Sequence, residues 1–261
     1  MKIRTIISAL ESAAPLSLQE NYDNSGLQVG DPDCDADSAL ICVDVTEDVV
    51  QEAVERRSGL IISHHPPLFR PLHQLSCSTY VERAVVSAVR NNIAIYSCHT
   101  NLDAAPEGMS VMLGSMLGLG NMVPLQPSPL LPGAGMGVVG QLASDMTLMD
   151  FLCHVKQSLG LSCIRYSRPN TDTIRRAALC TGAGASLMQA AKQYGADIYL
   201  SSDFKYNNFL DADRDLIIAD IGHFESEYCA INLIYEIIRK KITNFALYKS
   251  ERSFNPVNYL V

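Results

Sequence analysis

Hydrophobic residues recur along the chain in two patterns, as short apolar runs and as longer stretches with apolar positions three or four residues apart. The short runs predict buried strands and the longer stretches predict amphipathic helices. The expected strands cover residues 27–30, 39–44, 60–63, 93–97, 137–142, 177–181, 197–200 and 216–220. The expected helices cover residues 3–13, 47–57, 80–91, 107–117, 147–159, 186–194 and 227–240. Strands that alternate with helices predict an α/β fold with largely parallel pairing.

One segment, residues 121–137, interrupts this alternation. It is rich in proline and glycine and has no clear hydrophobic period, which is typical of a linker or lid. We therefore expect a first α/β half over residues 1–120, a linker over 121–137 and a second α/β half over 138–261.

The two halves share a strand–helix–strand pattern with matching spacings. A step of 22 residues separates corresponding positions, Cys42 and His64 in the first half, Cys180 and Ser202 in the second. His65 therefore aligns with Asp203. The next strand of each half leads to a histidine and, four residues later, to an acid: His99 with Asp103, and His223 with Glu227. We interpret this as an internal duplication, with a chance match of short apolar strands as the alternative.

Composition narrows the kind of partner. Charged residues make up 18% of the chain, below the usual quarter or so, which suggests surface covered by a second domain or by other subunits. The net charge of −8 argues against a nucleic-acid-binding surface, because such a surface needs a basic stripe. It does not exclude one bound nucleotide, since metal ions supply local positive charge.

Cysteine usage and the chain start bear on the compartment. The eight cysteines form no CxxC pair, and several sit in apolar runs, which favours buried free thiols over a disulfide framework. The first fifteen residues carry charge too early for a signal peptide, and no run of 18 apolar residues predicts a membrane span. We expect a soluble, cytoplasmic protein that does not bind membranes.

His64 and His65 are the first candidates for chemistry. They follow a buried apolar run and precede two prolines, which cannot continue a strand ladder. Ligand crevices of α/β sheets lie at the carboxyl ends of the strands. Two adjacent imidazoles on an irregular turn can point in different directions and serve two neighbouring metals. A pair of capping or surface histidines is the alternative; the position directly after a buried strand favours ligands.

Four of the six histidines fall just past strand ends, and two of them have an acid four residues on: His99 with Asp103, and His223 with Glu227. Residues four apart share one face of a helix, a spacing that suits a metal but also occurs on helix surfaces. The remaining histidines, His73 and His154, lack such neighbours and are expected to be ordinary polar residues.

Imidazole and carboxylate donors without thiolate suit Zn, Mn, Fe or Ni. Two such ions, about 3.5–4 Å apart, polarise a substrate oxygen and supply hydroxide, so the pattern favours a hydrolytic site. The turn Gly182–Ser186 joins a strand to a helix and either holds a phosphate on its backbone N–H groups or is simply a tight turn. No Walker A, GxGxxG or GxSxG pattern is present.

Four motifs in order carry a family resemblance: residues 21–30, His64-His65-Pro66, residues 99–103 and Gly222–Glu227. Together they resemble the Nif-three-like dinuclear-metal family, often labelled GTP cyclohydrolase I type 2 homologs, over nearly the whole chain. The short middle segment is similar to that of compact members without a large inserted domain. Two positions depart from the family pattern. Tyr22 stands where the family usually has Trp, and we expect this change to have a mild effect. Asn207 stands where many members have His, which argues against a role of this position in acid–base catalysis.

The resemblance implies two similar α/β halves enclosing a dinuclear metal site, and a ring-shaped homohexamer. It also implies five direct ligands, His64, His65, Asp103, His223 and Glu227. His99 would then lie near the metals, as a proton shuttle or as a partner of a ligand.

The expected function is that of a metal-dependent hydrolase with two divalent ions, Zn, Fe, Mn or Ni. A nucleotide or another phosphorylated small molecule is the expected substrate, GTP ring opening being one version, and His99 would move the proton. The alternative is a non-catalytic metal-binding oligomer that acts as an adaptor or metal store.

Overall fold

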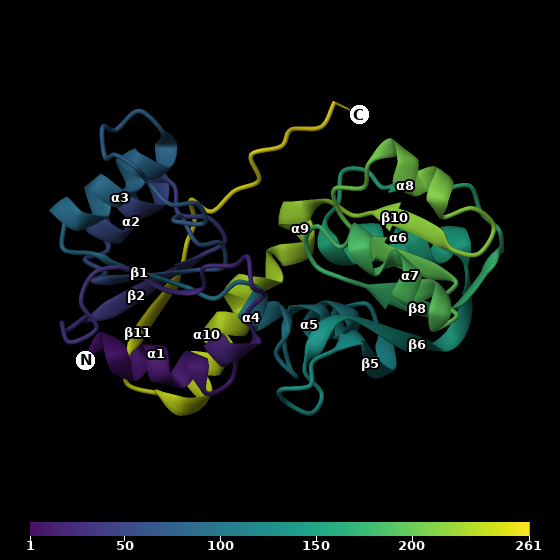
Figure 1. Cartoon of the computed structure of the whole chain (residues 1–261), viewed down its shortest axis with the longest axis horizontal. Helices are drawn as coiled ribbons and strands as arrows, with labels where there is room; N and C mark the ends of the chain where they lie inside the picture. Colours follow the sequence, from purple (N-terminus) through teal and green to yellow (C-terminus); the bar gives the residue numbers. More distant parts are fainter. Residues whose placement is uncertain (261) are drawn as a thin grey trace. The chain divides into compact units, whose positions relative to one another are not determined.

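The computed structural model describes residues 1–260 and shows a mixed α/β fold with two sheets (Figure 1). The chain forms two compact units. Unit 1 comprises Met1–Leu102 and Ala230–Phe254, and unit 2 comprises residues 103–229 and 255–260. The predicted domain boundaries stay a prediction, and each unit is described by itself below.

Unit 1 is built on a five-stranded sheet with the order β1-β4-β3-β2-β11. Its strands are β1 (Gly26–Val29), β2 (Ser38–Cys42), β3 (Leu60–Ser63), β4 (Ala94–Ser97) and β11 (Ala246–Lys249). Its helices are α1 (Ile3–Glu11), α2 (Glu47–Glu55), α3 (Tyr80–Arg90), α4 (Thr100–Asp103, whose last residue is grouped with unit 2) and most of α10 (Cys229–Lys241). Only β1 runs antiparallel to its neighbour; the other pairings are parallel.

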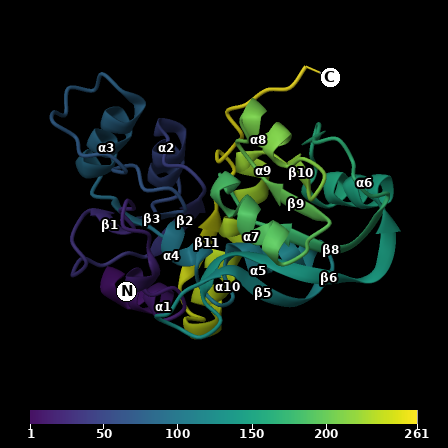
Figure 2. The same ribbon diagram turned by 45° about the vertical axis from the view of Figure 1, so that its right-hand side comes forward.

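Strands β2, β3 and β4 are buried along their whole length, as parallel strands covered on both faces are. Helices α2 and α3 lie on one side of the sheet and α1 on the other (Figure 1, Figure 2). Thr46 and Thr79 directly precede α2 and α3 and cap their first turns. Each threonine side chain accepts a hydrogen bond from the backbone N–H of the residue three positions later, Val49 or Glu82.

Unit 2 is built on a six-stranded sheet with the order β5-β6-β8-β9-β10-β7. Its strands are β5 (Leu119–Pro127), β6 (Gly135–Thr147), β7 (Arg165–Tyr166), β8 (Thr173–Leu179), β9 (Ile198–Ser201) and β10 (Ile217–Asp220). Its helices are α5 (Met109–Met116), α6 (Leu148–Leu159), α7 (Met188–Gln193), α8 (Tyr206–Asp211) and α9 (His223–Glu227). Strands β8, β9 and β10 are parallel, and the remaining pairings are antiparallel.

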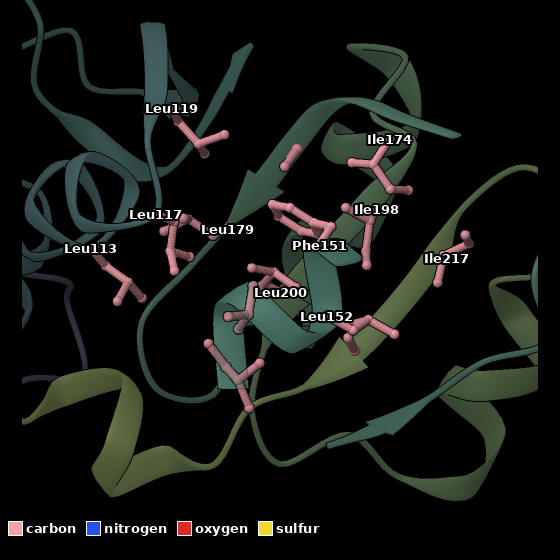
Figure 3. Packing of buried hydrophobic residues seen from close by; sticks show 14 of the residues in the cluster. Leu113, Leu117, Leu119, Phe151, Leu152, Ile174, Leu179, Ile198, Leu200 and Ile217 are labelled. Atoms are coloured by element: carbon pink, nitrogen blue, oxygen red, sulfur yellow. The ribbon is translucent and has the colours of Figure 1, made fainter. Parts of the chain in front are cut away.

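The core of unit 2 follows the alternation of side chains along β9. Ile198 and Leu200 face α6, where Phe151 and Leu152 point among them (Figure 3). Tyr199, between them in sequence, faces the opposite side and packs with Met188 of α7. Each face of this sheet is therefore sealed by a helix, which leaves the carboxyl ends of the strands as the place for polar side chains.

The predicted linker, residues 121–137, contains regular secondary structure. Most of it forms β5 and the start of β6, which pair as an antiparallel hairpin. Gly135 has φ +155°, and a Cβ there would lie 2.3 Å from the backbone oxygen of Gln126, so glycine is required for this close pairing. The Pro and Gly content that suggested a linker reflects a hairpin with tight backbone contacts.

The internal duplication is confirmed by the sheet topology. Each unit has three central parallel strands, β2-β3-β4 in one and β8-β9-β10 in the other, flanked by a short antiparallel edge strand, β1 or β7. The register also corrects one pairing. Ser63 lies opposite Ser97, whereas the equivalent Ser201 lies opposite Asp220, so His99 corresponds to Gly222 rather than to His223. The predicted match of the two histidines is off by one residue.

Within residues 1–260, no helix combines the length and the apolar character needed to cross a bilayer.

Candidate metal centre

In unit 1, three imidazoles gather at the carboxyl ends of β3 and β4. One ring nitrogen from each of His64, His65 and His99 lies within 4.8 Å of the others. The backbone N–H of His64 still donates to Cys42 O at the end of β2, at 3.1 Å, and that of His65 donates to Val43 O, one residue further on, at 3.0 Å. The next residue is Pro66, which has no N–H, so the ladder ends where the histidines stand.

The Nδ1 atom of each of these histidines faces an oxygen. His64 Nδ1 lies 2.8 Å from the backbone oxygen of Cys98, and His65 Nδ1 lies 2.8 Å from Asp44 Oδ1. His99 Nδ1 lies 2.7 Å from Asp23 Oδ1. A carbonyl oxygen only accepts, so Nδ1 of His64 carries the proton and the lone pair of the neutral ring is on Nε2. Metal-binding histidines are held in this way.

Asp23, which holds His99, is an ionised carboxylate inside the protein. Its side chain has no exposed surface, and it also accepts from the Thr100 N–H at 3.0 Å and the Ser25 hydroxyl at 2.8 Å. Burial alone raises the pKa of Asp23, but hydrogen bonds from His99 and Thr100 outweigh it and hold the pKa well below the ordinary range. Asp23 therefore fixes the orientation of the His99 ring.

In unit 2, His223 and Glu227 occupy one face of α9. His223 Nε2 lies 3.1 Å from Glu227 Oε2, and His223 Nδ1 lies 2.7 Å from Asp203 Oδ2. Burial opposes the charged imidazolium, but Glu227 and Asp203 outweigh it and raise the pKa of His223 to about 9. A carboxylate thus orients this histidine as well, and Glu227, 3% exposed, is a buried anion.

Asp103 and Glu227 both lie near two buried thiols of unit 2, those of Cys180 and Cys229. Asp103 Oδ1 accepts from the Thr181 hydroxyl at 3.4 Å, and Asp103 is 7% exposed. Burial, and then the charges of Asp103 and Glu227, raise the pKa of Cys180 to about 12, and the same causes raise the pKa of Cys229 to about 12. Both thiols stay protonated, so the donors here are imidazole and carboxylate, as predicted.

Gly182 makes room for Glu227. Its φ is +63°, and a Cβ at this position would lie 2.2 Å from Glu227 Oε1. The Gly182 N–H donates to Ser226 Oγ at 3.0 Å, and the Gly184 N–H donates to Ser201 Oγ at 2.9 Å. Because these N–H groups are used within the protein and the turn faces a carboxylate, the tight-turn interpretation of Gly182–Ser186 is favoured over a phosphate site.

The structure places the predicted residues in two groups. Unit 1 brings together His64, His65 and His99, and unit 2 brings His223 beside Glu227 and holds Asp103 near the same thiols as Glu227. The single five-ligand centre stays a prediction. His154 lies partly exposed on α6 of unit 2, while His73 lines a hollow of unit 1.

Sequence reasoning missed the three carboxylates that orient histidines, Asp23, Asp44 and Asp203. A signal for two of them was present, since Asp44 and Asp203 come within two residues of the ends of β2 and β9. Asp23 lies in a turn-rich loop and gave no such signal.

These residues fit a divalent metal. Imidazole Nε2 atoms and carboxylates, with thiols held protonated, are the donor set that Zn, Fe, Mn and Ni share. The fold and the donors thus define a class of protein: two similar α/β halves whose strand ends carry imidazole and carboxylate groups able to hold a metal.

The Duf34/NIF3 (NGG1p interacting factor 3) family model matches residues 1–256, and the chain belongs to this family. A GTP cyclohydrolase 1 type 2 homolog of Clostridium perfringens is 35% identical over 243 residues, which cover 93% of each chain. A protein of the same description from Nostoc sp. is 34% identical over 245 residues, 92% of each chain.

Solved structures are similar over the whole fold. A Bacillus cereus protein related to NIF3 has a TM-score of 0.93 and 25% identity, covering 100% of this chain and 99% of its own. The hypothetical protein SA1388 of Staphylococcus aureus has a TM-score of 0.91 and 26% identity with the same coverage. Reduced HcgD from Methanocaldococcus jannaschii has a TM-score of 0.80 and 25% identity, covering 96% and 98%. The resemblance inferred from the four sequence motifs is confirmed.

Proposed function

We propose that the protein is a metal-dependent hydrolase with two divalent ions, Zn, Fe, Mn or Ni. His64, His65, Asp103, His223 and Glu227 would be the direct ligands, and His99 the residue that moves the proton. The observation that carries this proposal is the set of Nδ1 contacts. An oxygen that accepts from Nδ1 makes Nε2 the atom through which each histidine would bind a metal.

The chemistry follows from what each side chain can do. Bound divalent ions polarise a substrate oxygen and make water more acidic. His99 Nε2 accepts a proton, and Asp23, 2.7 Å from Nδ1, stabilises the imidazolium that forms. The buried Glu227 carboxylate and Asp103 contribute the negative charge that offsets the cations.

The substrate class we propose is a nucleotide or another phosphorylated small molecule, with GTP ring opening as one version. The relatives described as GTP cyclohydrolase 1 type 2 homologs support it, as does the chemistry of divalent ions, which attract phosphate oxygens. The net charge of −8 makes cations at the site the natural means of attracting such an anion.

We further propose that the chain forms a homo-oligomer, a hexamer by resemblance to the family. The low share of charged residues, 18%, supports a surface partly covered by other subunits. Light scattering coupled to size-exclusion chromatography gives the mass directly; a monomer at micromolar concentration contradicts this part of the proposal.

The central experiment combines elemental analysis with a turnover assay. Purified protein loaded in turn with Zn, Fe, Mn and Ni is tested against nucleotides and phosphoesters. We expect about two ions per chain and turnover with at least one metal. Stoichiometric metal without turnover of any compound at high enzyme concentration would sink the hydrolase and leave the adaptor or metal store. Absence of bound metal would contradict both.

The variant that separates these functions is His99→Ala, with His154→Ala as the matched control. We expect His99→Ala to keep its metal and to lose turnover about 100-fold or more, the usual range for a general acid–base residue. His154 lies on α6 outside the donor groups, so its variant should match the wild type in metal content and turnover. Unchanged turnover in His99→Ala would remove His99 from the mechanism.

A further inference from the structure

A hollow of about 800 Å³ lies in unit 1 beside the histidine group. Two loops form its walls, residues 22–24 before β1 and residues 68–75 after β3, and Val85 of α3 contributes to its lining. The second of these loops belongs to the long connection from β3 to α3. The function proposed above uses none of the hollow's residues except Asp23.

Two aromatic side chains stand in this hollow with much of their surface open. Tyr22 is 65% exposed and Phe69 is 41% exposed, and their ring centroids are 6.5 Å apart at an angle of 69°. Phe69 also contacts His99 edge to face, with centroids 5.9 Å apart. The aromatic wall is therefore continuous with the imidazole that we propose to move the proton.

The charge of the lining selects against an anion. None of the described residues that line the hollow is Lys or Arg. Its one carboxylate, Asp23, is engaged by His99, Thr100 and Ser25. A phosphate in this hollow would lose part of its hydration without gaining a Lys or Arg partner, which is costly. A flat uncharged ring would instead cover apolar surface and stack on an aromatic face.

The walls are tied together by hydrogen bonds. Asn24 Nδ2 donates to the backbone oxygen of Leu68 at 2.8 Å and so links the two loops. At the end of the longer loop, Glu82 accepts from the backbone N–H groups of Ser76 at 2.9 Å and Ser78 at 3.0 Å. A site whose walls are already held loses less conformational entropy when a ligand binds.

We propose that this hollow binds the uncharged aromatic ring of the substrate, a heteroaromatic base when the substrate is a nucleotide. The ring packs against Tyr22 and Phe69, and the reacting part of the substrate lies past Phe69 toward His99, whether it is a phosphorylated group or, in ring opening, the far edge of the ring. This deepens the hydrolase proposal and rests on it for the identity of the reacting group. Ring binding itself needs neither metal nor turnover.

The test measures binding of four neutral nucleosides, adenosine, guanosine, cytidine and uridine, with ribose as the ring-free control. Calorimetry is done on the full chain after metal removal by chelation. We expect at least one nucleoside to bind about tenfold or more tighter than ribose, in line with stacking of one base on an aromatic residue. Four nucleosides that bind no better than ribose would overturn the proposal.

Variants then locate the ring. Phe69→Leu keeps an apolar side chain of similar size and removes the aromatic face, and Tyr22→Ala removes the second ring. Each should weaken nucleoside binding about tenfold, whereas Tyr22→Phe should bind like the wild type. Tyr206→Ala on α8, at a residue 78% exposed, is the control for loss of an open aromatic side chain and should change nothing. Wild-type binding in Phe69→Leu and Tyr22→Ala contradicts the site.

The two proposals fail separately. Nucleoside binding that depends on Phe69, in a protein that hydrolyses nothing, keeps the ring site and rejects the hydrolase. Turnover that Phe69→Leu leaves unchanged in KM and kcat, for substrates with and without an aromatic ring, keeps the hydrolase and rejects the ring site.

Discussion

The two units share a parallel β-α-β core but carry different residues at equivalent strand ends. After β3, unit 1 has His64 and His65; at the same positions after β9, unit 2 has Ser202 and Asp203. One scaffold thus presents three imidazoles in unit 1 and mainly carboxylates, with a single histidine, in unit 2. The comparison shows that the duplicated fold places side chains at equivalent strand ends, while the residue types at those positions determine which kind of metal-binding group each unit offers.

The orienting carboxylates differ in the same way. In unit 1, Asp44 follows β2 and holds His65 on the next strand. The equivalent of Asp44 in unit 2 is Gly182, which leaves space for Glu227. In unit 2 the orienting carboxylate instead follows the next strand: it is Asp203, the equivalent of His65, and it holds His223. Each unit therefore keeps an acid–imidazole pair but builds it from different strands.

The largest effect should come from Glu227→Gln, which removes the buried carboxylate beside His223 in unit 2. The amide keeps the shape of the side chain but cannot offset a cation, and Glu227 no longer helps raise the pKa of His223. We expect metal affinity to fall by more than ~100-fold, beyond the 10–100-fold range of residues that only orient ligands. Elemental analysis after dialysis against a weak chelator measures it.

Glu225→Gln, two residues earlier on α9, is the matched control and should keep its metal, because Glu225 contacts Asn255 instead. If both groups of donors bind one metal pair, Glu227→Gln and His65→Ala should each reduce the metal content below one ion per chain. Full loss of one ion and retention of the other in both variants would mean that the units bind metal independently.

Asp44→Asn and Asp203→Asn test whether the orienting carboxylates of the two units contribute equally to metal binding. Each variant removes the charge that orients one histidine, so each should weaken metal binding about 10–100-fold. Titration with a competing metal indicator measures both, with Asp211→Asn, exposed at the end of α8, as the control. An effect in one unit only would show that the two acid–imidazole pairs do not play the same part.

The sequence predicted the strand ends well because buried parallel strands are short apolar runs, and their ends are marked by polar residues and Pro66. The hairpin β5–β6 was missed because its Pro and Gly residues serve close backbone pairing, which composition cannot distinguish from a linker. Strand β11 was missed because Ala246–Lys249 has no buried residue to set a pattern.

The site was predictable in its strand-end donors but not in their partners. Asp23 meets His99 across 76 residues of sequence, a contact that only the folded sheet creates. The one-residue error between His99 and His223 has a similar cause. Spacing along the chain aligned the two histidines, whereas the register of β3 with β4 and of β9 with β10 decides the equivalence.

A smaller effect is expected from Gly182→Ala, which puts a Cβ where unit 2 has made room. The methyl group would displace Glu227 Oε1, and the left-handed backbone adds strain of about 1–2 kcal/mol. We expect metal affinity to fall about tenfold, roughly the lower limit for a disturbed ligand.

Gly195→Ala is the control that separates strain from contact. Its φ of +65° matches that of Gly182, but the nearest atom to a Cβ is Arg176 Nη1 at 3.7 Å. Both variants should lower the thermal midpoint, and only Gly182→Ala should lower metal affinity. Equal metal affinity in the two would show that Glu227 does not need the space at Gly182.

The smallest effect concerns the connection that unit 1 has and unit 2 lacks. Residues 64–79 join β3 to α3, whereas residues 202–205 suffice between β9 and α8. Backbone and then side-chain hydrogen bonds from Ser78 and Ser76 outweigh desolvation and lower the pKa of Glu82 to about 2, from an ordinary 4.5. The stabilisation from Glu82 is therefore complete above about pH 5 and is lost as pH falls toward 2.

Glu82→Gln should consequently lower the thermal midpoint at pH 7 and speed proteolysis within residues 64–79, with a difference from wild type that shrinks as pH falls toward 2. Glu47→Gln, on the surface of α2, controls for loss of an exposed helical carboxylate. A difference that stays constant with pH would mean that Glu82 acts through packing. Because residues 68–75 wall the hollow, a loosened loop should also weaken nucleoside binding, and the metal donors of unit 2 should be unaffected.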